Sequence, residues 1–102
     1  MVIYEVNLKV ESGIWAEYSA WLKKHQKKML KNDGFRGVKN YWVQASANSN
    51  EAEICVHYEL ESIEKLERYF RDHAEEMRSE ALTLFGNKFS ASRRVLLSKK
   101  DV

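Results

Sequence analysis

The sequence predicts one α+β domain whose elements follow the order β-α-β-β-α-β. Two stretches alternate apolar and polar residues with the period of a strand, and two others repeat apolar residues at the spacing of a helix. The chain has 102 residues, of which 44% are hydrophobic, and this is enough for one domain with a core. No stretch has the composition of a linker, so we expect a single domain over 1–102, with 98–102 as a loose tail.

The first half of the chain contains a strand, a helix and a second strand. Residues 2–10 alternate apolar and polar side chains, which predicts a half-buried strand. Ser12 can cap a helix whose apolar stripe ends at the Asn-Asp-Gly turn signal of residues 32–34. Residues 35–45 are rich in Val, Tyr and Trp, which predicts a second strand, and its irregular apolar phase predicts a bulge or an edge position.

The second half repeats the strand–helix–strand order. Residues 46–50 are polar and are expected to form a hairpin loop, and residues 52–60 alternate regularly, which predicts a third strand. Ser62 can cap a helix over 62–85, and residues 89–97 supply the fourth strand. This is the ferredoxin-like order, in which a four-stranded antiparallel sheet carries both helices on one face as a two-layer sandwich.

The face of the predicted sheet that carries no helices is polar. The first and third strands are expected to be central, antiparallel neighbours. Their residues on this face are Ile3, Glu5, Asn7, Lys9, Glu53, Cys55, His57 and Glu59. Because side chains alternate along a strand, one of the consecutive residues Arg93 and Arg94 points the same way. The face is therefore either in contact with water or the lining of a polar cavity.

Charge and composition exclude several classes of partner. The net charge of +2 is too small for a nucleic-acid footprint, and the open face lacks the stacking aromatics that an RNA-binding domain of this topology needs. The single cysteine, Cys55, excludes an internal disulfide and a four-cysteine metal site, and it fits a reducing compartment. There is no signal-peptide pattern and no apolar run of about 18 residues. We expect a cytoplasmic protein without membrane, nucleic-acid, metal or cofactor partners.

Several side chains have both a chemical and a structural interpretation. His57 beside Glu5 and Glu59 can act as a general base, although a histidine in a polar cross-strand ladder explains the same pattern. His25 lies on the apolar stripe of the first helix and is expected to border the core. Trp42 is expected to pack against other aromatics or to contact a second copy of the chain.

Five sequence blocks, in order along the chain, carry a resemblance to a known family. They are V-I-Y-E-V-N-L at 2–8, E-Y-x-x-W-L at 17–22, D-G-F at 33–35, H-A-E-E-M-R at 73–78 and F-S-A-S-R-R-V-L at 89–96. These blocks resemble a small bacterial family catalogued as a domain of unknown function and placed with the dimeric α/β barrels. The resemblance implies a homodimer in which two sheets pack face to face, which agrees with the uncovered face derived above.

The wider superfamily includes antibiotic-biosynthesis monooxygenases, haem-degrading oxygenases and small lactone isomerases. The resemblance implies chemistry in the cleft between sheet and helices, without a tightly bound metal. The haem-degrading branch uses an Asn on the first strand together with a Trp and a His on the second helix. Asn7 suits the first role and His73 suits the third, whereas Leu66 or Tyr69 stands where the Trp is expected. No catalytic set therefore carries over intact.

Three functions remain open from the sequence. The first is a homodimer that binds a small organic ligand in a polar cavity, and its candidate binding residues are Glu5, Glu59, Trp42 and His73. The alternative is a cofactor-independent monooxygenase or isomerase. Its candidate catalytic residues are Asn7, His57, Arg93 and Arg94. The second alternative is a structural or partner-binding dimer that uses the lysine-rich back of the first helix.

Overall fold

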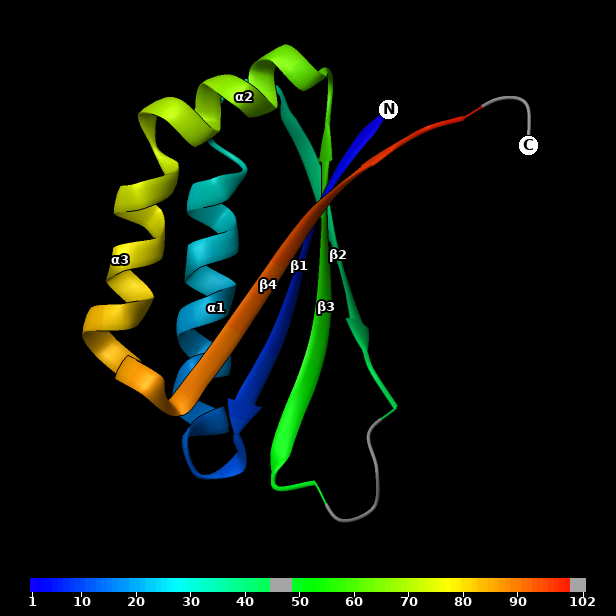
Figure 1. Cartoon of the computed structure of the whole chain (residues 1–102). Coiled ribbons are helices and arrows are strands. Elements are labelled where there is room, and N and C mark those ends of the chain that lie inside the picture. The colour runs from blue at the N-terminus through cyan, green and yellow to red at the C-terminus, as the bar shows by residue number, and fades with distance from the viewer. Residues whose placement is uncertain (45–48, 100–102) are drawn as a thin grey trace.

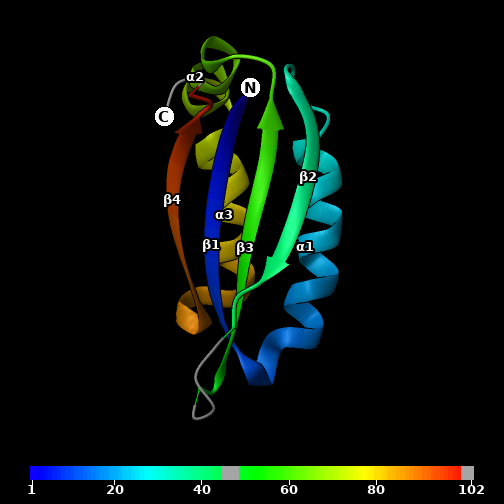
Figure 2. The ribbon, with the colours of Figure 1, turned by 90° about the vertical axis from the view of Figure 1, so that its right-hand side faces the viewer.

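In the computed structural model, which describes residues 1–44 and 49–99, one antiparallel sheet has the strand order β2-β3-β1-β4 (Figure 2). The strands are β1 (Val2–Glu11), β2 (Phe35–Trp42), β3 (Glu51–Leu60) and β4 (Phe89–Leu97). The helices are α1 (Trp15–Met29), α2 (Ile63–Asp72) and α3 (Ala74–Phe85), with 3-10 turns at Ser12–Ile14 and Gly86–Lys88. The predicted ferredoxin-like fold is confirmed. Most of the predicted hairpin loop and the end of the predicted tail lie outside the described residues.

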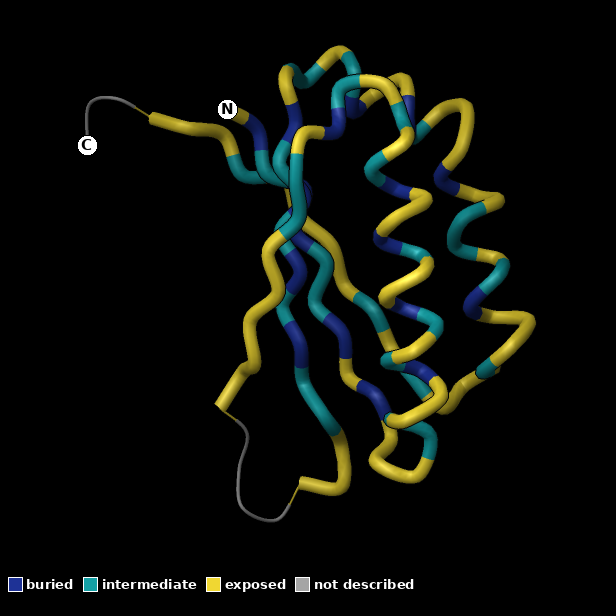
Figure 3. Tube along the Cα trace, turned by 180° about the vertical axis from the view of Figure 1, so that it is seen from behind, coloured by how far each residue is buried: buried dark blue, intermediate teal, exposed yellow. Residues whose placement is uncertain are grey.

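The three helices lie on one side of the sheet. Helices α1 and α3 run along that face, α2 crosses one end of it, and no helix or strand of residues 1–44 and 49–99 covers the opposite face (Figure 1). Buried residues recur along the strands and on the sides of the helices that face the sheet (Figure 3). The core includes Tyr4, Leu8, Val10, Tyr18, Leu22, Val56, Tyr58, Leu60, Leu66 and Tyr69. Period-two strands and helical stripes thus meet in one apolar layer.

The second helix differs from the sequence prediction, because the chain forms two helices where one was expected over 62–85. The backbone of His73 leaves the helical region, with φ −133° and ψ −22°, and α3 begins at the next residue. The break lets α2 bury Leu66 and Tyr69 at one end of the sheet while α3 runs along it. The apolar stripe continues through the break because both helices face the same core, so the spacing alone did not reveal it.

Strand β2 explains the irregular apolar phase seen in the sequence. It is an edge strand, and its pairing with β3 has a bulge between Phe35 and Gly37. A bulge adds one residue to one strand of a pair and so interrupts the alternation of faces. Both features predicted for this segment are therefore present, although the strand ends at Trp42 rather than near residue 45.

The turn between α1 and β2 makes a testable prediction at Gly34. Its φ of +89° is one that L side chains rarely adopt, and a methyl group there would approach the side chain of Lys65 to 2.6 Å. Gly34→Ala should therefore lower the free energy of unfolding by about 1–2 kcal/mol, measured by urea denaturation. Gly13→Ala is the matched control, because nothing lies within 4 Å of its added carbon. Equal stability of the two variants would contradict this account.

Candidate functional site

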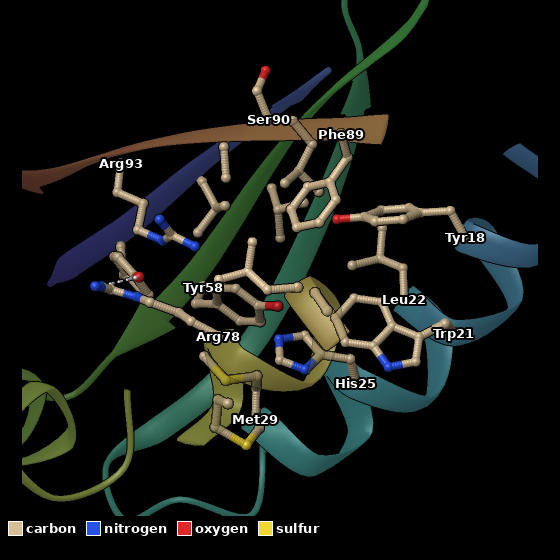
Figure 4. A pocket seen from close by; sticks show the side chains of 18 of the residues that line it. Tyr18, Trp21, Leu22, His25, Met29, Tyr58, Arg78, Phe89, Ser90 and Arg93 are labelled. Carbon is tan, nitrogen blue, oxygen red and sulfur yellow. Dashed lines mark hydrogen bonds between the residues drawn. The ribbon is translucent and has the colours of Figure 1, made fainter. Parts of the chain in front are cut away.

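A cavity of about 260 Å³ lies between the helix-facing side of the sheet and helices α1 and α3 (Figure 4). Strands β1, β3 and β4 supply its sheet wall through residues that alternate toward the helices. The residues that give it chemical character are Tyr18, Trp21, His25, Arg78, Phe89 and Arg93. Most of the remaining wall is apolar, so the cavity can hold an organic molecule against hydrocarbon while offering a few polar contacts.

One side of the cavity is aromatic. Tyr18 lies at its centre, with ring centroids 5.5 Å from Trp21, 5.3 Å from Phe89 and 5.0 Å from Phe85. The rings are tilted against one another, an arrangement that aromatic pairs favour. Tyr18 and Trp21 are brought to the same place because positions three apart share one face of α1. This wall can pack against a flat apolar ligand.

Two arginines lie at the other side of the cavity (Figure 4). Arg78 comes from α3, and its Nη2 donates a hydrogen bond to the Tyr4 hydroxyl at 3.1 Å. Its Nε is buried and has no hydrogen-bond partner among the described residues. Arg93 comes from β4 and faces the same cavity. Within residues 1–44 and 49–99, neither guanidinium forms a salt bridge with a carboxylate.

His25 lies between these two sides on α1. Its ring stacks on Trp21 with centroids 4.6 Å apart, and its Nδ1 is buried without a hydrogen-bond partner in the described part of the chain. Burial lowers the pKa of His25 to about 4, a shift that the carboxylate of Glu80 opposes. The imidazole is therefore neutral at pH 7 and keeps a free lone pair or N–H at Nδ1. His25 borders the core as predicted, through its stacking on Trp21, which packs against the core cluster. The hydrogen bond also predicted for one of its ring nitrogens is not seen among the described residues, where Nδ1 has no partner.

Glu80 ties the two helices together behind the cavity. Its Oε1 accepts a hydrogen bond from Trp21 Nε1 at 3.0 Å, and its Oε2 pairs with Lys28 Nζ at 3.1 Å. These contacts lower the pKa of Glu80, the hydrogen bond from Trp21 being the main cause. The carboxylate thus fixes the Trp21 ring, which forms part of the cavity wall. Its salt bridge to Lys28 occupies one of the lysines on the exposed side of α1.

A second polar cluster lies on the open face of the sheet, around the buried carboxylate of Glu5. Its Oε1 accepts hydrogen bonds from Asn7 Nδ2, at 2.8 Å, and from Arg94 Nε. Its Oε2 lies 2.8 Å from Nε2 of His57. The hydrogen bonds from Arg94 and Asn7 lower the pKa of Glu5 to about 2, against the opposing effect of burial. Glu5 is therefore ionised at neutral pH.

The structure divides the predicted site residues between the two faces. Asn7, His57 and Arg94 meet around Glu5 on the open face, whereas Arg93 faces the cavity on the opposite side. Glu59 lies on the open face, with an oxygen 3.9 Å from Lys39 Nζ. The other predicted binding residues lie apart from both groups.

Trp42 and His73 are the two predicted binding residues that lie apart from both the cavity and the cluster around Glu5. Trp42 packs against Trp15, with ring centroids 5.2 Å apart, and is 69% exposed near the edge of the sheet. His73 lies at the junction of α2 and α3, where its N–H bonds Tyr69 O. Sequence reasoning missed Arg78 as a cavity residue. The only available signal was its place one turn after Ala74 on a helix, which does not distinguish a cavity residue from a surface one.

Comparison with protein-family models gives a match over residues 1–99 to the family described as Domain of unknown function (DUF4286). The chain belongs to this family. The resemblance drawn from the sequence blocks is thereby confirmed. A comparison with curated proteins finds no match.

Solved structures that resemble the chain share its fold at low sequence identity. A putative antibiotic biosynthesis monooxygenase from Deinococcus radiodurans has a TM-score of 0.72 and 11% identity, over 100% of this chain and 96% of that one. The cofactor-independent oxygenase SnoaB from Streptomyces nogalater, in a mutant form, has a TM-score of 0.67 and 10% identity, over 99% and 96%. A dimeric ferredoxin-like protein from an uncultured marine organism has a TM-score of 0.60 and 12% identity, over 97% of each chain. Identities this low establish the fold alone.

None of the helices in the described part of the chain is both long and apolar enough to cross a bilayer.

The half-buried imidazole of His25 makes a testable prediction about acid stability. Its pKa is about 4 in the folded protein and near 6.5 when exposed, so the unfolded chain takes up this proton first as the pH falls. The stability from the neutral imidazole is complete above pH 6.5 and is lost on acidification toward pH 4, by on the order of 2–3 kcal/mol. His25→Phe keeps a ring on Trp21 and should flatten the pH dependence of urea unfolding in this range.

The matched control for His25→Phe is His73→Gln, which removes an exposed imidazole from the helix junction. Its unfolding free energy should follow the same pH curve as the parent protein. A His25→Phe curve as steep as that of the parent between pH 6.5 and 4 would contradict the assignment.

Proposed function

We propose that this protein binds a small planar organic anion in the cavity between the sheet and helices α1 and α3. The observation that carries the proposal is the pair of buried polar atoms without partners among the described residues, His25 Nδ1 and Arg78 Nε, on two residues that line the same cavity. Buried polar groups in native proteins are nearly always hydrogen-bonded, because an unpaired one costs about 1–3 kcal/mol. A ligand that reaches both atoms would remove this cost.

The size of the cavity favours a ligand with one or two rings. A cavity of roughly 150 Å³ accommodates benzene. The volume here is about 260 Å³, which leaves room for a ring with a carboxylate or a second ring. The aromatic side formed by Tyr18, Trp21 and Phe89 offers flat surfaces for such a molecule.

The charge of the cavity favours an anion. Arg78 and Arg93 both line it, and no carboxylate pairs with either guanidinium in the described part of the chain. Guanidinium groups bind planar carboxylates and related oxyanions through parallel hydrogen bonds. The tyrosines of the cavity do not supply a negative charge opposite the two guanidiniums, because they are not ionised at neutral pH. Burial raises the pKa of Tyr18 to about 12 and that of Tyr58 still further. The ligand is therefore expected to carry its negative group at the arginine side and its ring at the aromatic side.

Calorimetric titration with a panel of aromatic carboxylates and phenolates tests this proposal. Arg78→Gln should weaken binding of the best ligand by roughly 10- to 100-fold, the value of charge-assisted hydrogen bonds worth about 1.5–3 kcal/mol. The control is Arg71→Gln, an exposed arginine of α2 whose Nε pairs with Asp72 at 3.1 Å. Binding that is equally strong in both variants, or neutral analogues that bind as well as anions, would contradict the proposal.

A second candidate is catalysis in the same cavity, as a cofactor-independent oxygenase or an isomerase. The observation that favours it is the neutral imidazole of His25 beside two guanidiniums, since a neutral imidazole can accept a proton and a cation can stabilise the resulting anion. One structural neighbour is titled a cofactor-independent oxygenase. The sequence-based assignment of Asn7, His57, Arg93 and Arg94 as catalytic residues stays a prediction. All of them except Arg93, which lines this cavity, lie on the opposite face of the sheet.

Two variants separate these catalytic assignments once a bound ligand is known. If the cavity is the reaction site, His25→Gln should abolish oxygen consumption or isomerisation while the ligand still binds, because the glutamine amide can hydrogen-bond but does not accept a proton at neutral pH. If the cluster around Glu5 on the open face is the reaction site, His57→Ala should abolish the reaction instead. A ligand that is bound and never converted by the parent protein would leave binding as the function and contradict the catalytic candidate.

We also propose that two copies pair through the open faces of their sheets. This face carries no helix in the described chain, and its β2 edge presents Tyr41, which is 47% exposed and packs edge-on against His57 at 5.2 Å. A structural neighbour is titled a dimeric ferredoxin-like protein. Twofold pairing is the commonest way to cover such a surface.

A cytoplasmic location, which the single cysteine suggests, stays a prediction.

Sedimentation equilibrium tests the pairing. Tyr41→Glu places a charge on the proposed interface and should raise the dimer dissociation constant at least tenfold, since burying an unpaired charge costs several kcal/mol. Lys24→Glu, on the exposed back of α1, is the matched charge-changing control and should leave the mass unchanged. A monomeric parent protein, or equal dissociation of both variants, would contradict the proposal.

A further inference from the structure

Three metal-ligating side chains converge on the open face of the sheet, opposite the cavity. One donor atom each from Glu5, Cys55 and His57 lies within 4.8 Å of the other two. The register explains the convergence, because Glu5 pairs directly with His57, and Cys55 opposes Asn7 two positions along. Side chains at this spacing share one face of adjacent strands. The donors are thus placed by the two central strands rather than by a loop.

The donor set is chemically specific. A carboxylate oxygen, an imidazole nitrogen and a thiolate sulfur together suit zinc, whereas Mg²⁺ and Ca²⁺ take oxygen ligands. With bonds of about 2.0–2.1 Å and a tetrahedral angle, nitrogen and oxygen ligands of zinc stand roughly 3.3 Å apart. Glu5 Oε2 and His57 Nε2 are 2.8 Å apart. If Oε2 and Nε2 move apart by about half an ångström, a zinc ion can bind both atoms. The ion then replaces the hydrogen that they share in the hydrogen bond.

The carboxylate of Glu5 is held in the orientation that a ligand needs. Its Oε1 accepts hydrogen bonds from Asn7 Nδ2 and Arg94 Nε, which leaves Oε2 directed at His57. Hydrogen bonds of this kind to the second oxygen fix metal-ligating carboxylates in general. The Glu5 side chain is only 4% exposed, so it is immobilised before any ion arrives. In the single chain the Arg94 side chain is 67% exposed, and there water screens its repulsion of a cation.

We propose that Glu5, Cys55 and His57 bind one zinc ion per chain through Oε2, Sγ and Nε2, with the fourth position left for water. On binding, the Cys55 thiol releases its proton to solvent and becomes the thiolate ligand. His57 binds as the neutral imidazole, with its hydrogen on Nδ1. No electron is transferred. This site lies on the other side of the sheet from the organic-ligand cavity, so it does not depend on ligand binding there. It lies on the face proposed for pairing, and its test is the binding of the ion rather than the mass of the assembly.

The full-length protein, freed of metal with a chelator, tests the site in two titrations. Calorimetry with Zn²⁺ should give one ion per chain, and Cys55→Ser or His57→Gln should each weaken binding at least tenfold. Titration with Co²⁺ as a spectroscopic substitute should give a thiolate-to-cobalt charge-transfer band that Cys55→Ser abolishes. Both substituted side chains are half-buried on the open face, so neither substitution leaves a cavity in the apolar core between sheet and helices. Circular dichroism confirms that each variant is folded.

His73→Gln is the matched control, because it removes a histidine from the helix junction and should leave zinc affinity and the cobalt spectrum unchanged. Zinc affinity that is the same in the parent and in the Cys55→Ser and His57→Gln variants would overturn the site. So would a cobalt complex without the thiolate band, or a stoichiometry of one zinc ion per two chains, which would place the ion between molecules.

Discussion

The pairing of β1 with β3 and β4 is the constraint on which both candidate sites depend. Directly opposed residues of an antiparallel pair share a face, so Glu5 meets His57 on one side and Arg94 on the other, all on the open face. The next residue, Val6, lies opposite Arg93, and that row faces the helices. A slip of one residue would exchange the faces of every side chain in the strand. The apolar row of β1 must be buried, and this requirement fixes the register and both sites with it.

The sheet separates two surfaces of different electrostatic character. On the open face, the buried carboxylate of Glu5 is stabilised by three neighbours that hydrogen-bond to its oxygens, and without them its burial would cost several kcal/mol. On the helix side, Arg78 and Arg93 face a largely apolar cavity with no carboxylate beside them among the described residues. One face therefore favours cations and a polar interface, and the other favours an organic anion.

The helices decide the shape of the cavity. The break at His73 turns α3 along the sheet, and this direction brings Arg78 within 3.1 Å of the Tyr4 hydroxyl. Helix α1 supplies His25 and Trp21, and Glu80 of α3 holds the indole through a hydrogen bond of 3.0 Å. The wall of the cavity is thus built from two helices that are joined to each other, which limits how far it can close on its own.

The sequence by itself determined the fold and the chemistry of the open face. Alternation with period two and helical stripes are local consequences of burying apolar residues, so they placed Glu5, Asn7 and His57 on one face without coordinates. Only the tertiary structure decided that Arg94 rather than Arg93 joins them, because the face of a strand depends on its register with β1. It also decided the cavity, since Arg78 and His25 lie 53 positions apart in the chain and their neighbourhood follows from how α1 and α3 pack on the sheet. Packing between distant segments leaves no periodic trace in either segment. This is why the residue pattern predicted the composition of the open face but not the residues that line the cavity.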